Sequence, residues 1–504
     1  MDKEPPNILL ITSDQHHWQA IGYQNPQVKT PNLDRLAEMG TIFTRAYCPN
    51  PTCTPTRASI ITGQYPSQHG AYSLGTKLSE SVHTVGEDFT KAGYRTALIG
   101  KAHFQPLRGT ETYPSLESYP ILQDLDFWRE FDAPFYGFDH VELARNHTDE
   151  AHVGQHYALW LEGKGCTDWR DYFRAPTGHN NSQKRTWEIP EAYHYDAWIA
   201  ERTNVQLAHY AQTGEQFFIW ASFFDPHPKY LVPEPWDTMY DPLTIDVPAL
   251  VPGEHDANPP HFQMTQQVNP DYSAWREPDG NGMHGFHSHL HDRDELAKDI
   301  AIYYGMISLM DKYIGKILDK LDELGLTENT LVVFTTDHGH FHGHHGLIAK
   351  GAFHYEDMIK VPMIARLPGR IPAGRSTDAL QTLVDYAPTF LSIIQQDVPR
   401  SMTGINQQDV WFGDKQRVRD HIIVENRHQP TTLHLKTYVN DRYKLTVYFG
   451  RDYGELFDLE SDPAEINNLW SDPNSASLKA ELVMCLLQAE MGKEPVWMPR
   501  IASA

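Results

Sequence analysis

A cysteine, a proline and an arginine stand at close spacing in the run CTPTR, residues 53–57. The stretch that follows, RASIITG, is typical of a helix. Cys53 is therefore expected near a helix N-terminus, where free backbone N–H groups and the helix dipole favour negative charge. The guanidinium of Arg57 can donate two parallel hydrogen bonds to an anion bound at this helix N-terminus. The residues alone allow two interpretations: a thiolate nucleophile with a lowered pKa, or a cysteine that is chemically remade before it acts.

Two aspartates end apolar runs that lie far apart in the sequence. Asp14 ends NILLITSD, and Asp337, followed by His338, lies near the end of LVVFTTDHG. Carboxylates from separate strands suit a hard divalent cation such as Ca²⁺ or Mg²⁺, and one histidine leaves Mn²⁺ open. Taken singly, each aspartate is equally well explained as a cap of the helix after its strand.

Four basic side chains occupy comparable places. Lys101 and His103 end RTALIGKAH, and His227 ends FFIWASFFDPH. Lys350 lies 13 residues after Asp337 (350 minus 337). Each alone is more often a surface residue or a satisfied polar group. Together, beside a metal, they form a cationic pocket that stabilises the charge developing on the oxygens of a tetrahedral oxyanion.

The apolar runs predict the elements that bring these residues together. Runs of this length, separated by helical patterns such as TPNLDRLAEMG and YYGMISLMDKYIGKILDKLDELG, are typical of buried parallel strands in an α/β sheet. In open α/β sheets, ligands bind beyond the carboxyl ends of the strands. All four runs place their reactive residues at that end. We therefore predict one site at one edge of a large, mixed but mostly parallel sheet covered by helices.

The rest of the chain is divided by its composition. Residues 104–200 are rich in aromatic residues and are predicted to be an insertion beside the site; a second irregular segment, 240–292, ends in GMHGFHSHLHD. Short alternating segments after about residue 415 predict a small antiparallel sheet, with ASLKAELVMCLLQAEMG as a helix packed on it. We predict a catalytic domain over 1–414 and a smaller α+β subdomain over 415–504.

Charge and cysteine content restrict the partners. The formal charge of −24 over 504 residues disfavours nucleic acid and anionic membranes. Four cysteines without a C-x-x-C pair argue against a disulfide framework and a zinc knuckle. The N-terminus lacks the pattern of a signal peptide, and no apolar stretch is long enough for a membrane span. We expect a cytoplasmic protein, or a periplasmic or secreted one if a leader has been removed.

Six motifs in order resemble those of the type I sulfatases of the alkaline phosphatase superfamily. CTPTR followed by TGQYPSQHG resembles the signature in which the family's cysteine is oxidised to formylglycine. The other motifs are PNILLITSDQ, IGKAHF, DPHPKYLVPEP, TTDHGHFHGHHGLIAKG and, near the C-terminus, GELFDLESDPAEINNLW. One C-x-P-x-R alone is a weak signal, but six motifs over most of the chain are a specific one. The resemblance implies an alkaline-phosphatase-like fold.

The resemblance also implies roles for individual residues. Cys53 would be converted to formylglycine by a formylglycine-generating enzyme. One hydroxyl of the aldehyde hydrate attacks sulfur, and loss of a proton from the second expels sulfate. His227 would donate a proton to the leaving alcohol, and His103 would be the base. Lys101 and Arg57 would contact the hydrate, and Lys350 would contact the sulfate. One divalent metal, with calcium as the first choice, would be held by Asp14, Gln15, Asp337, His338 and the modified Cys53.

Three departures from the family pattern affect these assignments. Many sulfatases have two consecutive aspartates where this chain has Asp14 and Gln15. His338 replaces the common asparagine, which leaves Mn²⁺ or Mg²⁺ as alternatives to Ca²⁺. His340 and His344 stand where glutamate is frequent, and the run HGHFHGHH could bind zinc adventitiously.

The sequence therefore predicts a sulfatase that hydrolyses sulfate monoesters of a carbohydrate, with Lys101, His227 and Lys350 in contact with the substrate. The aromatic and polar insertion favours a sulfated oligosaccharide from a glycosaminoglycan or an algal polysaccharide, with exo action as one option. A phosphonate monoester or phosphodiester hydrolase of the same superfamily is the first alternative, because the Asp–Gln and Asp–His pairs resemble those enzymes. A non-catalytic protein that binds sulfated glycans is the second.

Overall fold

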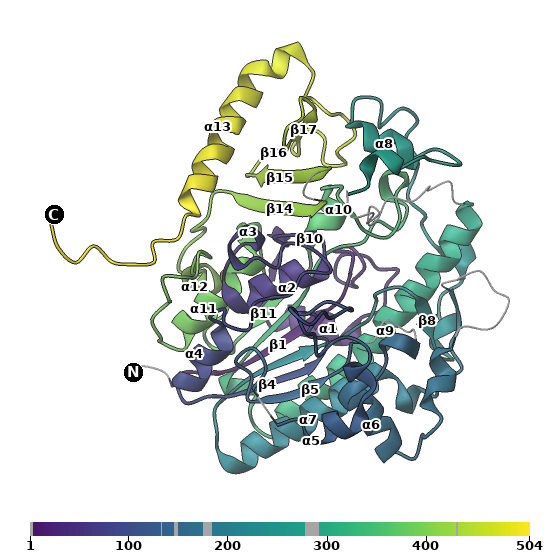
Figure 1. Cartoon of the computed structure of the whole chain (residues 1–504), viewed down its shortest axis with the longest axis vertical. Helices are drawn as coiled ribbons and strands as arrows, with labels where there is room; N and C mark the ends of the chain where they lie inside the picture. The colour runs from purple at the N-terminus through teal and green to yellow at the C-terminus, as the bar shows by residue number, and fades with distance from the viewer. Residues whose placement is uncertain are drawn as a thin grey trace.

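An eight-stranded sheet forms the centre of the protein (Figure 1). The structure is a computed structural model that describes residues 4–132, 134–145, 150–174, 184–277, 292–429 and 432–503. In spatial order the strands are β12 (Arg375–Thr377), β2 (Thr41–Phe43), β11 (Met363–Arg366), β9 (Thr330–Thr336), β1 (Asn7–Ser13), β7 (Phe217–Ser222), β4 (Arg95–Gly100) and β5 (His140–Leu143).

Most of the sheet is parallel. β9, β1, β7, β4 and β5 pair in parallel, whereas β11 runs antiparallel to both β9 and β2. The four apolar runs identified in the sequence are β1, β4, β7 and β9, so their carboxyl ends lie along the same edge. The structure thus confirms the predicted mixed, mostly parallel α/β sheet.

The sheet is buried on both faces, because successive strand residues enter different cores. Ile8 and Leu10 of β1 belong to one apolar cluster, and Leu9 and Ile11 belong to the other. This alternation is the two-residue period of a strand. Since both faces are covered, both sets of residues are apolar, which explains why the sequence shows continuous apolar runs rather than alternating ones.

Helices cover each face. The first cluster includes side chains of α2 (Cys53–Thr62), α4 (Val85–Lys91) and α11 (Tyr386–Ile393). The second includes α1 (Pro31–Glu38), α6 (Gln155–Gly163), α7 (Tyr195–Thr213) and the long α9 (Arg293–Glu323). Within the described ranges, none of the helices has the length and apolar character needed to span a bilayer.

Short elements complete the large domain. The helices are α3 (Pro66–His69), α5 (Leu125–Glu130), α8 (Pro260–Thr265), α10 (Glu356–Ile359) and α12 (Gln408–Trp411). One small sheet has the order β10 (Lys360–Val361), β3 (Ala46–Tyr47) and β13 (Gln381–Thr382), and another pairs β6 (Lys184–Thr186) with β8 (Tyr230–Val232).

Residues 104–200 contribute to the core as well as to the surroundings of the site. They supply β5 at one edge of the large sheet and the helices α5 and α6. Trp128, Trp169 and Trp187 of this segment are at most 2% exposed. Much of the aromatic content that suggested sugar stacking therefore fills the interior.

The C-terminal region forms a separate small sheet at the top of Figure 1. The antiparallel strands are β14 (Ile422–Gln429), β15 (Leu433–Val439), β16 (Tyr443–Tyr448) and β17 (Gly454–Asp458). Helix α13 (Ala476–Gly492) packs on this sheet through Leu482, Leu486 and Ala489. Its bounds coincide with the helix predicted from the sequence.

Glu425 of β14 connects the small sheet to the segment after α2. Its carboxylate accepts hydrogen bonds from the N–H and the Oγ of Ser67, both at 2.8 Å, and contacts the ammonium groups of Lys436 and Lys493. Burial alone would raise the pKa of Glu425, but Lys493 and Lys436 lower it to about 2. The ionised form is therefore the one that the folded state stabilises.

We predict that Glu425→Gln lowers the free energy of unfolding by about 3 kcal/mol at neutral pH, because the buried Lys493 and the partly buried Lys436 keep only Glu490 as an anionic partner. The folded-state pKa of about 2 lies below the ordinary 4.5, so this contribution is present above pH 4.5 and is lost as the pH falls toward 2. Urea unfolding across this pH range measures both effects. Exposed Glu481→Gln is the matched control, and equal urea midpoints for wild type and Glu425→Gln would contradict the assignment.

Candidate functional site

Two buried carboxylates meet at the carboxyl edge of the large sheet. Asp14 follows β1 and Asp337 follows β9, and these strands pair in parallel with Ser13 opposite Thr336. Both aspartates have no exposed surface. The Oδ1 atom of Asp337 accepts the backbone N–H groups of Gln15 and His338, each at 3.0 Å. Strand pairing therefore fixes the two acids beside one another.

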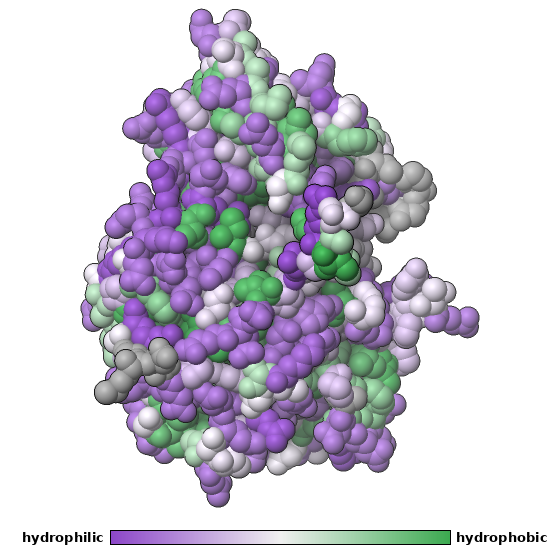
Figure 2. Space-filling view, turned by 90° about the vertical axis from the view of Figure 1, so that its left-hand side faces the viewer, coloured by the Kyte–Doolittle hydropathy of each residue, from purple (hydrophilic) through white to green (hydrophobic). Residues whose placement is uncertain are grey.

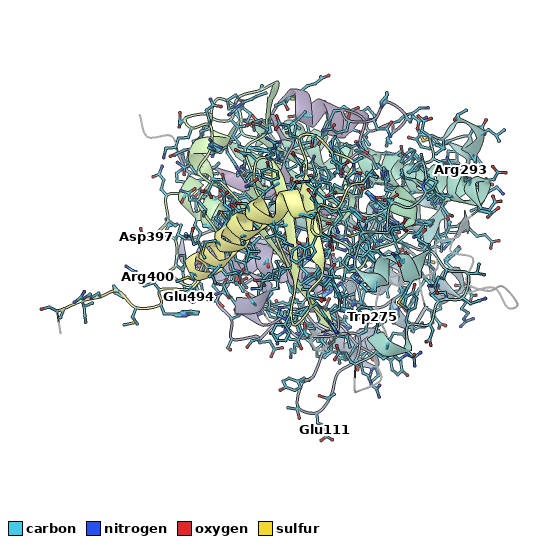
Figure 3. The ribbon with its side chains drawn as sticks, turned by 90° about the horizontal axis from the view of Figure 1, so that it is seen from above. Glu111, Trp275, Arg293, Asp397, Arg400 and Glu494 are labelled. Atoms are coloured by element: carbon cyan, nitrogen blue, oxygen red, sulfur yellow. The ribbon has the colours of Figure 1, made fainter. Side chains whose placement is uncertain are left out.

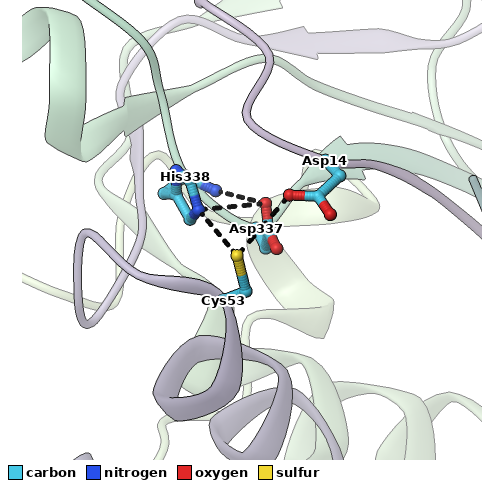
Figure 4. A group of neighbouring side chains, drawn as sticks. All are labelled: Asp14, Cys53, Asp337 and His338. Atoms are coloured by element: carbon cyan, nitrogen blue, oxygen red, sulfur yellow. Dashed lines mark hydrogen bonds and ion pairs between the residues drawn. The ribbon is translucent and has the colours of Figure 1, made fainter. Parts of the chain in front are cut away.

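Cys53 faces these acids from the first turn of α2. Its Sγ lies 3.6 Å from Oδ1 of Asp14 and 3.2 Å from Nε2 of His338. Figure 4 shows Asp14, Cys53, Asp337 and His338 converging on one point. One ligand atom from each of the four lies within 4.8 Å of the others. The structure thus brings together side chains from two strand ends and a helix N-terminus.

Arg57 holds α2 against the sheet edge. Its Nε donates to Oδ2 of Asp337 at 2.9 Å, and its Nη2 lies 3.8 Å from Oδ2 of Asp14. Its Nη1 donates to the Lys101 carbonyl at 2.9 Å and to Ser222 Oγ at 2.7 Å. The guanidinium is fully buried, so its charge is balanced by the two aspartates. Arg57 therefore fixes the position of Cys53, one helical turn away.

Two lysines act on the Cys53 thiol. The Nζ of Lys350 lies 3.1 Å from Sγ, and Lys101 forms an ion pair with Asp14. Burial and Asp14 raise the pKa of Cys53, but Lys101 and Lys350 bring it below its ordinary value. Cys48 is buried without such neighbours, and burial raises its pKa well above the usual range. The site thus favours an anion at position 53 and not at position 48.

His227 lies on the opposite side of Lys350, after β7. Its Nε2 is 3.3 Å from Lys350 Nζ, and its Nδ1 donates to the Pro228 carbonyl. Burial holds its pKa well below the usual value; Asp14 opposes this effect, whereas Lys350 and Lys101 reinforce it. His227 is therefore neutral in this state, with its acceptor nitrogen directed at the lysine.

His103 is positioned by two residues that the sequence analysis missed. Arg145 donates from Nη2 to Nε2 of His103 at 2.6 Å, and Glu117 accepts the backbone N–H of His103 at 2.7 Å. Burial, followed by Arg145, holds the pKa of His103 well below its usual value. Arg145 lies two residues after the end of β5, at the same sheet edge as the other residues. The pattern HVELAR, in which a short apolar run is followed by a basic residue, could have indicated this position. It lies inside the segment that we interpreted as an insertion.

The donor set fits a divalent cation. His338 donates from Nδ1 to the Gly339 carbonyl at 3.0 Å, so its Nε2 lone pair faces Cys53 and the acids, as a metal ligand requires. The side-chain Oε1 of Gln15 is buried and has no hydrogen-bond partner. A metal would satisfy that oxygen and supply positive charge between Asp14 and Asp337. Asp14, Cys53, Asp337 and His338 thus lie close enough together to hold a cation of the Ca²⁺, Mg²⁺ or Mn²⁺ type, and Gln15 as a ligand stays a prediction.

The histidine run after Asp337 is hydrogen-bonded in this structure. His340 is buried and bonds the Ala349 carbonyl at 2.9 Å, and His344 lies 3.4 Å from Asp357. His17 also bonds Asp357, at 2.8 Å, while its Nδ1 accepts the Gln19 N–H. In this tautomer Nε2 of His17 carries the proton and donates to Asp357, so it has no lone pair with which to bind a metal beside His344. Zinc binding by His340 and His344 stays a prediction, and most of GMHGFHSHLHD lies outside the described residues.

Comparisons with known proteins agree with this geometry. A model of the Sulfatase family matches residues 6–395, and one described as N-sulphoglucosamine sulphohydrolase, C-terminal, matches residues 343–491. An arylsulfatase of Clostridium perfringens is 29% identical over 92% of this chain and 90% of its own. An N-acetylglucosamine-6-O-sulfatase of Bacteroides thetaiotaomicron is 24% identical over 96% and 86%. The phosphonate monoester hydrolase structure from Agrobacterium radiobacter superposes with a TM-score of 0.78 at 26% identity, over 97% and 96%.

We predict that divalent cations raise the melting temperature of the protein and that Asp337→Asn removes most of this increment. A cation at 100 times its dissociation constant stabilises the folded state by about 2.7 kcal/mol. Asp385→Asn is the matched control, because Asp385 is also a buried carboxylate bonded to an arginine, Arg419. Thermal melts with and without Ca²⁺, Mg²⁺ or Mn²⁺ measure the increment. An undiminished increment in Asp337→Asn would place the metal elsewhere.

Proposed function

Because the chain belongs to the sulfatase family, we propose that it hydrolyses sulfate monoesters of a carbohydrate through a formylglycine made from Cys53. The observation that carries the proposal is the environment of Cys53. Its Sγ lies among Asp14, His338 and Lys350, at the start of a helix, where an anionic oxygen nucleophile would be stabilised. Sγ stands where the hydroxyl oxygens of the formylglycine hydrate would lie.

Two groups complete the site. The formylglycine hydrate supplies two hydroxyls, one to attack sulfur and one whose deprotonation releases sulfate, and a formylglycine-generating enzyme is the partner that makes it. A divalent metal, for which we propose Ca²⁺, would supply Lewis acidity to the attacking hydroxyl and to the sulfate group when bound. Asp14, Gln15, Asp337 and His338 would hold it. One neutral ligand, Gln15, keeps the net charge of the site less negative than a second aspartate would.

The basic residues orient the reacting groups. Lys101 and Arg57, both bound to the buried acids, lie where they can hold the hydrate. Lys350 reaches Cys53 Sγ and His227, so its ammonium can bind a sulfate oxygen between nucleophile and leaving group. The negative charge that develops on the sulfate oxygens and the leaving oxygen is thereby stabilised by the fixed positive charges of these side chains, in a site from which water is largely excluded.

Two histidines would move the protons. The anionic ester adds negative charge beside His227, which favours its protonated form, and the proton then passes to the leaving alcohol oxygen. His103, which is neutral because of its lowered pKa, would accept the proton of the second hydroxyl. In this state Nε2 of His103 accepts a hydrogen bond from Arg145, so Nδ1 carries the ring proton, and Nε2 is the atom that would take up the hydroxyl proton once Arg145 releases it. Arg145 is therefore a positioning residue that sets the tautomer and basicity of His103.

The carbohydrate substrate is supported by the relatives rather than by exposed aromatic residues. The relative from Bacteroides thetaiotaomicron is described as an N-acetylglucosamine-6-O-sulfatase and matches 96% of this chain. A second candidate is a phosphonate monoester hydrolase. It is favoured by the Asp14–Gln15 and Asp337–His338 pairs and by the structural similarity to the enzyme from Agrobacterium radiobacter.

We predict that one preparation hydrolyses sulfated monosaccharides and oligosaccharides at least tenfold faster, by kcat/KM, than phosphonate monoesters or phosphodiesters with the same leaving group. Cys53→Ala should lose all turnover with the fold retained, because no hydroxyl remains at position 53. Cys48→Ala is the matched control and should retain activity, since Cys48 lies outside the site. A preference for phosphonates or phosphodiesters would establish the second candidate instead.

We predict that Arg145→Met shifts the acidic limb of the kcat/KM profile to higher pH. Burial is the larger cause of the low pKa of His103, but loss of the Arg145 charge still raises that pKa. A base works only above its pKa, so the limb moves upward. Arg145→Lys retains the charge and should leave the limb nearer its wild-type position. An unmoved limb in Arg145→Met would exclude His103 as the base.

A further inference from the structure

Helix α13 is apolar on two faces, only one of which is covered. Leu482, Leu486 and Ala489 pack on the small sheet. A second set of side chains is 41–61% exposed: Val483, Met484, Leu487 and Met491. These four recur at positions i, i+1, i+4 and i+8 and form a single stripe, which we call the outer stripe of α13. Helices that are apolar all round are normally buried all round.

The segment after α13, which we call the tail (residues 493–503), carries four more exposed apolar side chains. They are Val496, Trp497, Met498 and Ile501, at 61–87% exposure. Figure 1 shows the C-terminus far from the body, and Figure 3 shows the chain running outward beyond Glu494. Pro495 and Pro499 keep this segment from continuing the helix. The tail therefore leaves its own helix and presents its apolar residues to the surroundings.

The root of the tail is firmly held. Lys493 contacts the buried carboxylate of Glu425, and its carbonyl accepts a hydrogen bond from Gln68. The direction in which the tail departs is thus determined by the folded body. Eleven residues in extended form span about 36 Å, longer than the roughly 25 Å of the 17-residue α13.

The outer stripe and the tail together form an unusual concentration of exposed apolar surface. Of the twenty large apolar side chains exposed on the described part of the chain, eight lie between residues 483 and 501. Figure 2 faces this side, where green apolar residues stand among purple ones in the upper half. The outer stripe is continuous along the helix, and exposed apolar surface of this kind marks an interaction site.

Charge indicates which partner fits. Residues 476–504 contain three basic side chains (Lys479, Lys493, Arg500) and three acidic ones (Glu481, Glu490, Glu494), so their formal charge is zero, whereas the whole chain carries −24. Two copies of this chain repel each other over most of their surface. The C-terminal segment is neutral and apolar, so a second copy can approach there without that electrostatic cost.

We propose that two copies of this chain form a symmetric dimer in which the tail of each lies along the outer stripe of α13 of the other. The contact is isologous, which means that both copies use the same surfaces. Each copy therefore buries its own outer stripe under the partner's tail and its own tail against the partner's stripe. The tail of one copy is long enough to follow the whole of the partner helix. The dimer interface lies on the C-terminal region and leaves the carboxyl edge of the large sheet open to substrate.

Sedimentation velocity of the full chain tests the association. We expect a concentration-dependent dimer. Leu487→Glu with Met491→Glu, and separately a stop after Lys493, should each raise the dimer dissociation constant about 100-fold. Leu243→Glu is the matched control, since Leu243 is 92% exposed on a different surface. An unchanged far-UV circular dichroism spectrum in each variant shows that the fold is intact. A wild type that stays monomeric, or a dimer unaffected by both changes, would overturn the proposal.

Isotope-mixed crosslinking tests the arrangement. A photoreactive amino acid replaces Trp497, and ordinary and ¹⁵N-labelled copies are mixed before illumination. With equal amounts of the two copies, about half of the crosslinks from position 497 to α13 should join one light and one heavy peptide, because the copies pair at random. Crosslinks confined to peptides of the same label would show that the tail folds onto its own helix. Binding of the monomer to vesicles of neutral phospholipid, lost on removal of the tail, would assign the surface to a membrane; either result overturns the proposal.

Discussion

The pairing of two buried carboxylates with two buried cations is the interaction on which the rest of the site depends. Parallel pairing of β1 with β9 places Asp14 beside Asp337, and neither has exposed surface. Two such charges out of water are stable only when opposite charges meet them. Arg57 reaches both acids and Lys101 meets Asp14. The same guanidinium docks α2, so charge balance between the acids also determines where Cys53 lies.

The chemistry at position 53 follows from that arrangement. With the acids neutralised, the remaining positive field of Lys101 and Lys350 acts on Sγ and lowers the pKa of Cys53, while Cys48, five residues earlier and equally buried, has a raised pKa. The overall charge of −24 opposes an anionic substrate at long range. Selectivity for an anion therefore depends on short-range contacts inside the site, where the local charge is positive and water is excluded.

Much of the fold and the site was predictable, because each strand end carries its own sequence signal. The runs that became β1, β4, β7 and β9 are mainly apolar, and a polar residue of the site lies beyond the end of each strand. Their parallel arrangement then requires those residues to share an edge. The bounds of helix α13 also agree with the segment predicted from the sequence, which contains neither proline nor an internal glycine.

What the sequence did not reveal depends on tertiary packing. Arg145 follows a four-residue strand, too short for a distinct pattern, and its role appears only when β5 pairs with β4 beside His103. The tryptophans of residues 104–200 suggested sugar contacts, yet Trp128 and Trp169 pack in the interior. Composition does not tell an aromatic core from an aromatic binding surface. The tautomers of His338 and His17 likewise depend on how the fold orients a neighbouring backbone group, the Gly339 carbonyl for His338 and the Gln19 N–H for His17.

The most direct test of the account is the mass of the tryptic peptide AYCPNPTCTPTR, residues 46–57, from protein made in its own host. The peptide is analysed with and without alkylation. Position 53 is expected to have lost its sulfur and to carry an aldehyde, while Cys48 remains an alkylatable thiol. If both cysteines alkylate fully in a preparation that hydrolyses sulfate esters, the formylglycine mechanism is contradicted and the thiolate of Cys53 or a metal-bound hydroxide must be the nucleophile.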